Sequence, residues 1–157
     1  MGLREYITHE TVADIPLRPA LTVTPDTTVA QAVKLMRDNA LGCVFVVDSE
    51  QRPMGKFTER QLVKMLCGCV PLDEPVVRHM VALPEAGRVR MSDTVLKLLE
   101  NMRQNRLRFI CVVDEAGRVT GLTGQKGLME YVAEHFPRQV KVQMMDSKLH
   151  MNTREGA

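Results

Sequence analysis

The sequence predicts an α/β fold built from two copies of one unit, each with the element order β-α-β-β-α. The main observation is that the 157-residue chain matches itself, without a gap, at a shift of 66 positions. Val46-Val47-Asp48 falls on Val112-Val113-Asp114, and Gly55 falls on Gly121. Each copy also carries a helix-spaced apolar stripe and a short, dense apolar run. Self-similarity at a fixed period indicates one structural unit used twice, so we expect two halves packed with approximate twofold symmetry around a cleft.

Each copy begins with a short extended segment, at 21–23 and 87–89, and a helix follows. A side-chain oxygen placed just before a helix accepts hydrogen bonds from its free amides. The candidate caps are Thr27 or Thr28 in the first copy and Ser92 or Asp93 in the second. Apolar residues then recur at i, i+3, i+4 and i+7, which predicts one apolar face for each helix. These faces consist of Val29, Ala32, Val33 and Met36 in the first copy and Val95, Leu98, Leu99 and Met102 in the second.

The densest apolar runs lie at 43–47 and 109–113. They are rich in β-branched residues, too short for helices and not alternating, which is typical of strands buried on both faces. Turn-rich segments join each run to a second strand, at 54–57 and 119–123. A second helix closes each copy, at 59–66 and 125–135, with apolar faces formed by Leu62, Leu66, Leu128, Met129 and Val132.

These elements divide the chain into four parts. Residues 1–66 form the first repeat with its N-terminal lead, 67–74 a linker, 75–136 the second repeat and 137–157 a polar tail. Pro71 and Pro75 make the linker a poor helix. The tail is expected to be poorly ordered or used at a contact.

The composition excludes several classes of function. Apolar residues make up 45% of the chain and charged residues 25%, which is ordinary for a globular protein. A net charge of +2 and an aromatic content of 4% argue against a nucleic-acid partner. No apolar stretch approaches the ~20 residues needed to cross a bilayer, and the N-terminus lacks the pattern of a signal peptide. We therefore expect a cytoplasmic protein with no membrane partner.

The cysteines and histidines do not predict a metal site or an enzyme. Cys43 and Cys111 lie in apolar runs and are interpreted as small core residues. Cys67 and Cys69 are interpreted as reduced thiols at a helix end, because zinc sites usually need a second ligand pair. The four histidines share no metal-ligand spacing, and no nucleophile–base set is suggested.

A family resemblance rests on the strings Val46-Val47-Asp48 … Gly55-Lys56-Phe57-Thr58 and Val112-Val113-Asp114 … Gly121-Leu122-Thr123, and on the opening Val77-Arg78-His79-Met80. With these strings in this order, the chain resembles a pair of CBS domains (named after cystathionine β-synthase) over roughly residues 5–136. A chain made of such a pair resembles a stand-alone Bateman module. The resemblance implies a regulatory module rather than an enzyme, with no required cofactor. It also implies AMP, ADP, ATP or S-adenosylmethionine as ligand in the cleft between the repeats, and a disc-shaped homodimer.

The resemblance also implies which residues form the site. The family string is Gly-apolar-apolar-Ser/Thr-x-x-Asp, in which the Asp binds the ribose hydroxyls and the Ser/Thr and helix N-terminus hold phosphate. The first repeat keeps Thr58 but has Gln61 in place of Asp, so a weaker, uncharged ribose contact is expected. The second repeat has Gly124 in place of the Ser/Thr and Gly127 in place of the Asp, which leaves a Gly-rich helix start suited to an anion. Thr123 lies one position too early and can replace the missing Ser/Thr hydroxyl only if the strand shifts its register.

Basic residues near the expected cleft add to this set. Arg106 and Arg108 precede the second buried strand, and Arg60 and Lys126 occupy equivalent places in their repeats. Arginine is well suited to bidentate phosphate contacts. The alternative interpretation of each of these basic residues is a solvated surface charge. The alternative interpretation of His79 is a packed or surface histidine with no ligand contact. The candidate ligand-binding residues are Thr58, Arg60, Gln61, His79, Met80, Val81, Arg108, Thr123 and Lys126.

Two functions are compatible with these residues. The first is a regulatory ligand-sensing module that binds an adenine nucleotide and acts on an unknown regulated protein. The second is a protein-interaction or dimerisation module that has lost nucleotide binding. The absence of the Asp from both repeats supports this second function. A homodimer is expected in either case, because apolar residues on the helical faces need cover. The residues expected on these faces are Met65, Leu66, Tyr131 and Phe136.

Overall fold

The computed structural model describes residues 3–136, so the prediction for the tail at 137–157 lies outside the described residues. The first repeat contains β1 (Thr22–Val23), α2 (Val29–Asp38), β2 (Cys43–Val47), β3 (Pro53–Thr58) and α3 (Glu59–Cys67). The second contains β5 (Arg88–Arg90), α4 (Val95–Asn105), β6 (Phe109–Val113), β7 (Val119–Gly124) and α5 (Gln125–His135). Helix α1 (Leu3–His9) and strand β4 (Val81–Ala82) are additional. The predicted order β-α-β-β-α is confirmed in both copies.

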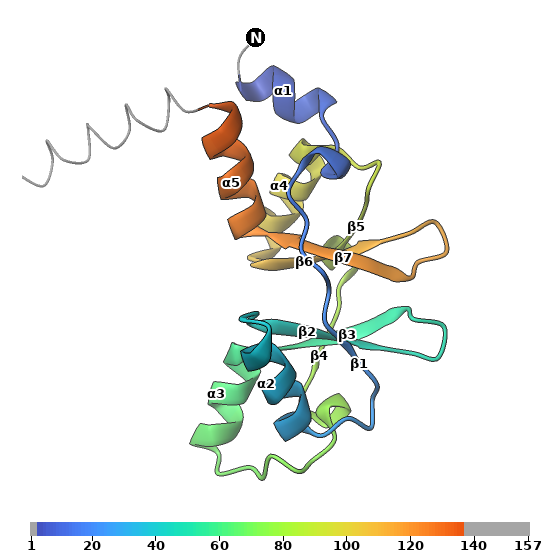
Figure 1. The fold of residues 1–157 in the computed structure, drawn as a ribbon, viewed down its shortest axis with the longest axis vertical. Coiled ribbons are helices and arrows are strands. Elements are labelled where there is room, and N and C mark those ends of the chain that lie inside the picture. The colour runs from blue at the N-terminus through green and yellow to red at the C-terminus, as the bar shows by residue number, and fades with distance from the viewer. Residues whose placement is uncertain (1–2, 137–157) are drawn as a thin grey trace, which may run out of the picture.

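Two small sheets face each other at the centre of the molecule, and the helices of each half lie on its outer side (Figure 1). One sheet has the strand order β1-β2-β3-β4 and the other β5-β6-β7. The strand β2 is buried along its whole length, as the non-alternating apolar run predicts. Its inner face packs against the other sheet in a shared core of Cys43, Phe45, Val47, Leu83, Cys111, Val113 and Leu122.

The two halves repeat each other down to the pairing register. Val46 pairs with Gly55 in the first sheet, and Val112 pairs with Gly121 in the second. Both antiparallel ladders shift register immediately after these residues, between 46 and 47 and between 112 and 113. An identical irregularity at equivalent places indicates that the duplicated sequence folds into a duplicated structure.

The segment that precedes each repeat packs on the opposite half. Gly55 and Lys56 of β3 pair with β4, which comes just before β5, the first strand of the second sheet. Conversely, Arg18 exchanges two backbone hydrogen bonds with Leu122, at 3.0 and 2.9 Å. The chain therefore crosses between the halves twice (Figure 1), and each half is completed by residues from the other side of the sequence.

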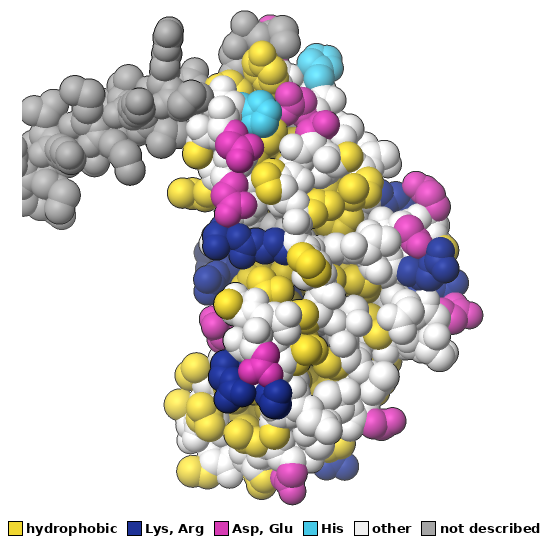
Figure 2. Space-filling view, viewed as in Figure 1, with side chains coloured by type: hydrophobic (Ala, Val, Ile, Leu, Met, Phe, Trp, Pro, Cys, Tyr) yellow, Lys and Arg dark blue, Asp and Glu magenta, His cyan; other side chains and the backbone are white. Residues whose placement is uncertain are grey.

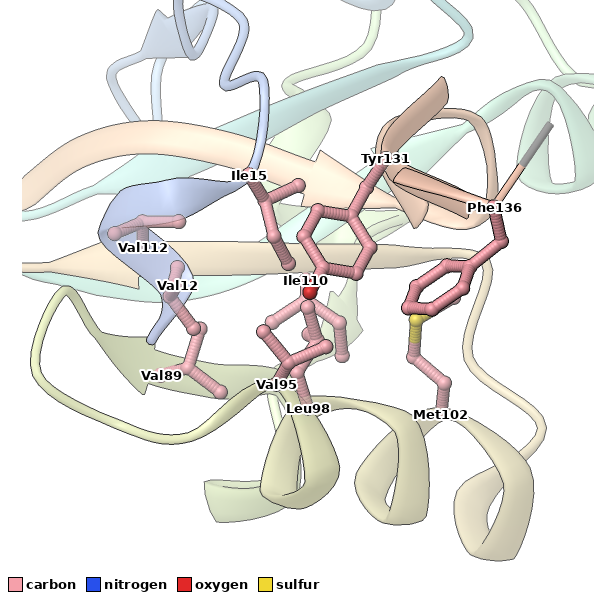
Figure 3. Close-up of a cluster of buried hydrophobic side chains, with 10 residues drawn as sticks. All are labelled: Val12, Ile15, Val89, Val95, Leu98, Met102, Ile110, Val112, Tyr131 and Phe136. Atoms are coloured by element: carbon pink, nitrogen blue, oxygen red, sulfur yellow. The ribbon is translucent and has the colours of Figure 1, made fainter. Parts of the chain in front are cut away.

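The core of the second half shows this exchange directly. Val12 and Ile15 from the N-terminal segment lie among buried side chains of β5, β6, α4 and α5 (Figure 3). The Tyr131 hydroxyl of α5 also donates to the Glu10 carboxylate. Burial of apolar side chains of this size contributes about 1.5–3 kcal/mol each, so the lead is a structural part of the second half.

The start of α4 corrects one prediction. Neither Ser92 nor Asp93 caps this helix; Thr94 does, because its hydroxyl accepts from the Lys97 amide at 3.2 Å. Asp93 instead accepts from the Arg90 amide in the preceding turn. In the first repeat the cap is Thr28, one of the two predicted candidates and the equivalent of Thr94.

The predicted apolar helix faces are buried only in part. Leu99 is 41% exposed and Met129 is 72% exposed, so neither belongs to a buried face. Met65, Tyr131 and Phe136, which were expected to await cover by a second copy, are buried within the described chain. The reason is that the crossing segments and the helix ends cover surfaces that a single repeat would leave open.

Candidate functional site

A pocket of about 450 Å³ lies between the halves, and we call it the first cleft. Its walls come from the end of β3 and the start of α3, from β4, and from the segment that joins α4 to β6. The lining residues are Gly42, Lys56, Thr58, Glu59, Arg60, Gln61, Lys64, Val81, Asn105, Arg106, Leu107, Arg108 and Phe109. Figure 2 shows Lys and Arg side chains gathered where the two halves meet, at the left edge of the molecule.

The helix start at the first cleft is closed by a local hydrogen-bond pair. The Thr58 amide donates to Gln61 Oε1 at 3.1 Å, and the Thr58 hydroxyl donates to the same oxygen. Helix α2 begins in a similar way, since the Thr28 amide donates to Gln31 Oε1 at 3.0 Å. Gln61, which was expected to contact ribose, therefore serves to cap α3, and its amide nitrogen is the group left to meet a ligand.

The first cleft is strongly cationic. Five of its lining residues are basic, namely Lys56, Arg60, Lys64, Arg106 and Arg108, and one, Glu59, is acidic. Within residues 3–136, none of these five side chains forms an ion pair. Like charges gathered without counter-charges create a positive potential that attracts anions.

Two of these cations are held in place by the second repeat. Lys56 lines the first cleft and is half-buried; burial lowers the pKa of its ammonium group, and its Nζ donates to the Phe109 carbonyl at 3.4 Å. The Arg108 guanidinium lies 5.7 Å from the centre of the Phe109 ring, a cation–π distance. Lys56 thus bridges the two halves at the first cleft.

Arg106 reaches the first cleft from an unusual backbone conformation. It ends α4 with a φ of 51°, in the left-handed region, and its amide donates to the Met102 carbonyl. Ala40 has the same φ at the equivalent place after α2. Non-glycine residues pay roughly 1–2 kcal/mol for this conformation. The positive side chain at a helix C-terminus also matches the helix dipole.

The equivalent pocket in the second repeat, the second cleft, has a volume of only about 50 Å³. A Cβ atom on Gly124 would lie 2.1 Å from the Arg108 carbonyl oxygen, and one on Gly127 would lie 3.0 Å from the Pro16 carbonyl oxygen. The backbone of Arg108 and that of Pro16 therefore lie where side chains at positions 124 and 127 would begin. The two glycines that replace the family's Ser/Thr and Asp are explained by this close packing.

Thr123 does not replace the missing hydroxyl. It pairs with Ile110 as Phe57 pairs with Val44, so the strand keeps its register. Its side chain is buried, and its Oγ1 has no hydrogen-bond partner among the described residues.

The predicted site residues fall into three groups: those that line the first cleft, those that line the second cleft, and those that line neither. Thr58, Arg60, Gln61, Val81 and Arg108 line the first cleft. Thr123 and Lys126 line the second cleft, to which Arg108 also contributes.

His79 and Met80 line neither cleft. His79 Nε2 lies 2.6 Å from the Glu74 carboxylate, and Met80 covers Gly55, where a Cβ atom would lie 2.6 Å from its sulfur. Sequence reasoning missed Lys56 and Lys64. The position of Lys64 one helical turn after Arg60 was the available signal, whereas nothing local indicated that Lys56 reaches the other half.

The four cysteines divide into two buried and two exposed thiols. Cys43 and Cys111 are buried, and burial raises the pKa of each thiol to about 12. Cys67 and Cys69 are exposed. Over residues 3–136, no cluster of His, Cys, Asp and Glu side chains is arranged to hold a metal ion. In that same part of the chain, every helix is too short or too polar to cross a membrane.

Two β-α-β-β-α halves that exchange their leading segments and enclose a cleft define a tandem-repeat module. The family model for the CBS domain matches residues 12–68 and again 77–134. The chain therefore belongs to the CBS domain family, and the resemblance read from the sequence is confirmed.

Individual relatives agree with this assignment. An uncharacterised 17.7 kDa protein of Acidianus ambivalens is 29% identical over 117 residues, which are 74% of this chain and 70% of that protein. A CBS domain protein of Pyrobaculum aerophilum, solved in complex with AMP, superimposes with a TM-score of 0.69 at 19% identity, over 87% of this chain and 98% of that one. The CBS domain pair of the protein MJ0100, solved with 5-methylthioadenosine and S-adenosyl-L-methionine, gives 0.70 at 18% identity, over 79% and 96%. At such identities the two structural likenesses concern the fold.

Proposed function

We propose that this protein is a regulatory ligand-sensing module that binds an adenine nucleotide in the first cleft. The observation that carries the proposal is the pocket of about 450 Å³ between the repeats, lined by five cations without ion-pair partners among the described residues. Two proteins of the same fold, solved with AMP and with S-adenosyl-L-methionine, lend support. No residue of this chain is assigned a catalytic role.

The lining of the first cleft suits the three parts of a nucleotide. Val81, Leu107 and Phe109 provide apolar surface for a base, while Arg60 and Arg106 provide charge for phosphate. Thr58 and Gln61 replace the family's charged ribose contact with neutral groups, and neutral hydrogen bonds are about half as strong as charge-assisted ones. The ribose therefore contributes little, and most of the affinity comes from base and phosphate.

Sensing follows from the position of the first cleft. Its walls belong to both halves, and Lys56 already links them through the Phe109 carbonyl. A ligand that binds one arrangement of the halves better than another shifts the population toward it. An anion that draws Lys56 away from this carbonyl changes the contact between the repeats.

Calorimetric titration with AMP, ADP, ATP and S-adenosylmethionine tests the proposal. We expect saturable binding of at least one nucleotide, with one ligand per chain because the second cleft is closed. Arg60→Ala should weaken binding about tenfold or more, as expected for loss of a hydrogen bond to a charged group. The matched control is Lys126→Ala, the equivalent position in the second repeat, which should leave binding unchanged. Absence of binding by all four ligands at millimolar concentration would reject the function.

A single observation favours the alternative of an interaction module without nucleotide. Gln61 is engaged in capping α3, and no acidic residue stands at the ribose position of either repeat. Ultraviolet absorbance after heat release from purified protein distinguishes the two functions. The chain has no Trp and two Tyr, so a co-purified adenine nucleotide would dominate the spectrum and argue against the alternative.

A homodimer is part of the proposal, on a surface that keeps Leu66 from the residues first expected and replaces the buried Met65, Tyr131 and Phe136. Val63 of α3 and Met129 of α5 occupy equivalent positions of the two repeats and are 57% and 72% exposed. Leu66 lies nearby on α3 and is 56% exposed. Helices α3 and α5 lie on the same side of the module, one in each half (Figure 1), so a second copy with the same symmetry can cover both.

Light scattering after size-exclusion chromatography tests the dimer. The wild type is expected to elute as a dimer, and Met129→Glu or Val63→Glu to shift it toward the monomer. Leu99→Glu, on α4, is the control and should not change the mass. A wild type that stays monomeric at high concentration would remove this part of the proposal.

A further inference from the structure

We infer that the first cleft selects its ligand by the number of phosphates, binding nucleoside triphosphate and diphosphate in preference to monophosphate and rejecting S-adenosylmethionine. The inference rests on the proposed function and goes beyond it by naming the ligand class. It depends on where the uncompensated positive charge of the molecule lies.

Cations elsewhere on the described chain are largely paired with carboxylates. Lys34 pairs with Asp38 at 2.5 Å, Lys97 with Asp93 at 2.7 Å and Arg118 with Asp114 at 2.8 Å. The first cleft gathers five basic side chains that form no ion pair within residues 3–136, with a single carboxylate, Glu59. That carboxylate lies against Gly42, with its Cδ 3.0 Å from where a Cβ of residue 42 would stand. One phosphate would leave most of these cations facing one another uncompensated.

The cations are distributed along the cleft rather than around one point. Arg60 and Lys64 are separated by one turn of α3, so their side chains project from the same face about 5–6 Å apart at Cβ. Arg106 and Arg108 come from the opposite repeat, and Lys56 lies on β3 with its Nζ at the Phe109 carbonyl. Successive phosphates of a polyphosphate chain can therefore meet different cations, and arginine can bind each in a bidentate manner.

The same set of charged side chains disfavours S-adenosylmethionine. It carries a sulfonium and an ammonium group, both positive, besides its carboxylate. The first cleft provides one acidic side chain to receive these two cations and five basic ones to repel them. Like charges placed together are unfavourable in a partly desolvated site.

The test is calorimetric titration of the full-length protein with AMP, ADP, ATP, tripolyphosphate and S-adenosylmethionine, at about 50 and about 200 mM salt. We expect the affinity to rise roughly tenfold with each added phosphate and to fall with salt, and no saturable binding of S-adenosylmethionine. Lys64→Gln, an exposed change that leaves the fold intact, should reduce the ratio of ATP to AMP affinity several-fold. Lys97→Gln, an equally exposed change outside the cleft, should not alter this ratio.

The outcomes separate this inference from the proposed function. AMP binding as tightly as ATP, or S-adenosylmethionine binding at all, would overturn the selection by phosphate number and leave nucleotide sensing intact. Tripolyphosphate binding as tightly as ATP would uphold the phosphate preference and overturn adenine recognition. No binding of any nucleotide would overturn both.

Discussion

Restoring the family's residue in the second repeat should damage the fold rather than rebuild a site. In Gly124→Ser, the new Cβ would lie 2.1 Å from the Arg108 carbonyl oxygen and 3.4 Å from the Cα of Phe109. The φ of Gly124 is 163°, an extended value that serine adopts without strain, so the cost is steric. Real contacts of this kind are essentially never shorter than 3.0 Å. Strand β6 must therefore move away from the start of α5.

The magnitude follows from the nature of the contact. Overpacking a well-packed site costs typically about 1–3 kcal/mol, and a 2.1 Å clash with backbone rather than with a flexible side chain belongs in the upper part of this range. We expect the free energy of unfolding to fall by about 2–3 kcal/mol and the melting temperature to fall by roughly 4–12 °C for a chain of this size. The weak bond from the Gln125 amide to the Arg108 carbonyl, at 3.3 Å, is lost as well.

Thermal and urea unfolding followed by circular dichroism measure this effect. The control is Thr58→Ser, which makes the same residue at the equivalent position of the first repeat and should cost less than about 1 kcal/mol. Calorimetry should find no second nucleotide bound to Gly124→Ser. If Gly124→Ser melted at the wild-type temperature, the close approach that explains the closed second cleft would be refuted.

Three further predictions concern single groups. Arg106→Gly and Ala40→Gly should each raise the free energy of unfolding by about 0.5–1 kcal/mol, since both relieve a left-handed backbone. Only Arg106→Gly should weaken ATP binding in calorimetry. Equal ATP affinity of the two variants would contradict a ligand role for Arg106. A thiol reagent at neutral pH should label the exposed Cys67 and Cys69 rapidly and the two buried cysteines only after unfolding, because burial raises the pKa of the buried thiols to about 12; rapid labelling of four thiols in the native protein would disprove this. The hydrogen bond from the Arg118 amide holds the pKa of Asp114 below its usual value. The carboxylate therefore stabilises the fold above its unfolded pKa of about 3.9 and loses this effect as the pH falls through the lower folded value. On acidification the melting temperature of Asp114→Asn should fall less than that of the wild type, and parallel melting curves would contradict this.

Most of the fold could be predicted from the sequence, because its signals are local or periodic. The shift of 66 positions, the apolar runs at 43–47 and 109–113 and the helix stripes identified the repeated elements within one or two residues. The N-cap of α4 was missed because three polar residues in a row compete for it, and only backbone geometry selects Thr94. The exposure of Met129 was missed because periodicity reports an apolar face without reporting what covers it.

The candidate site was predicted less completely, for a physical reason. Thr58, Arg60 and Arg108 could be proposed from motif position, and the structure places them in one pocket. Lys56 could not, because its role depends on reaching the Phe109 carbonyl, 53 positions away in the chain. Gln61 was interpreted as a ribose contact, whereas in the structure its side-chain oxygen accepts a hydrogen bond from the Thr58 amide.

The sequence by itself determined that this chain is a duplicated αβ unit, since repetition and hydrophobic period are properties of the chain alone, and its motif strings showed a resemblance to the CBS domain family. Only the tertiary structure decided that the two clefts are unequal. The first has a volume of about 450 Å³ between α3, β4 and the segment before β6, whereas the second has about 50 Å³ and places Gly124 and Gly127 close to the backbone of Arg108 and Pro16. Close approaches between residues distant in sequence depend on how the halves pack, and no local pattern encodes them.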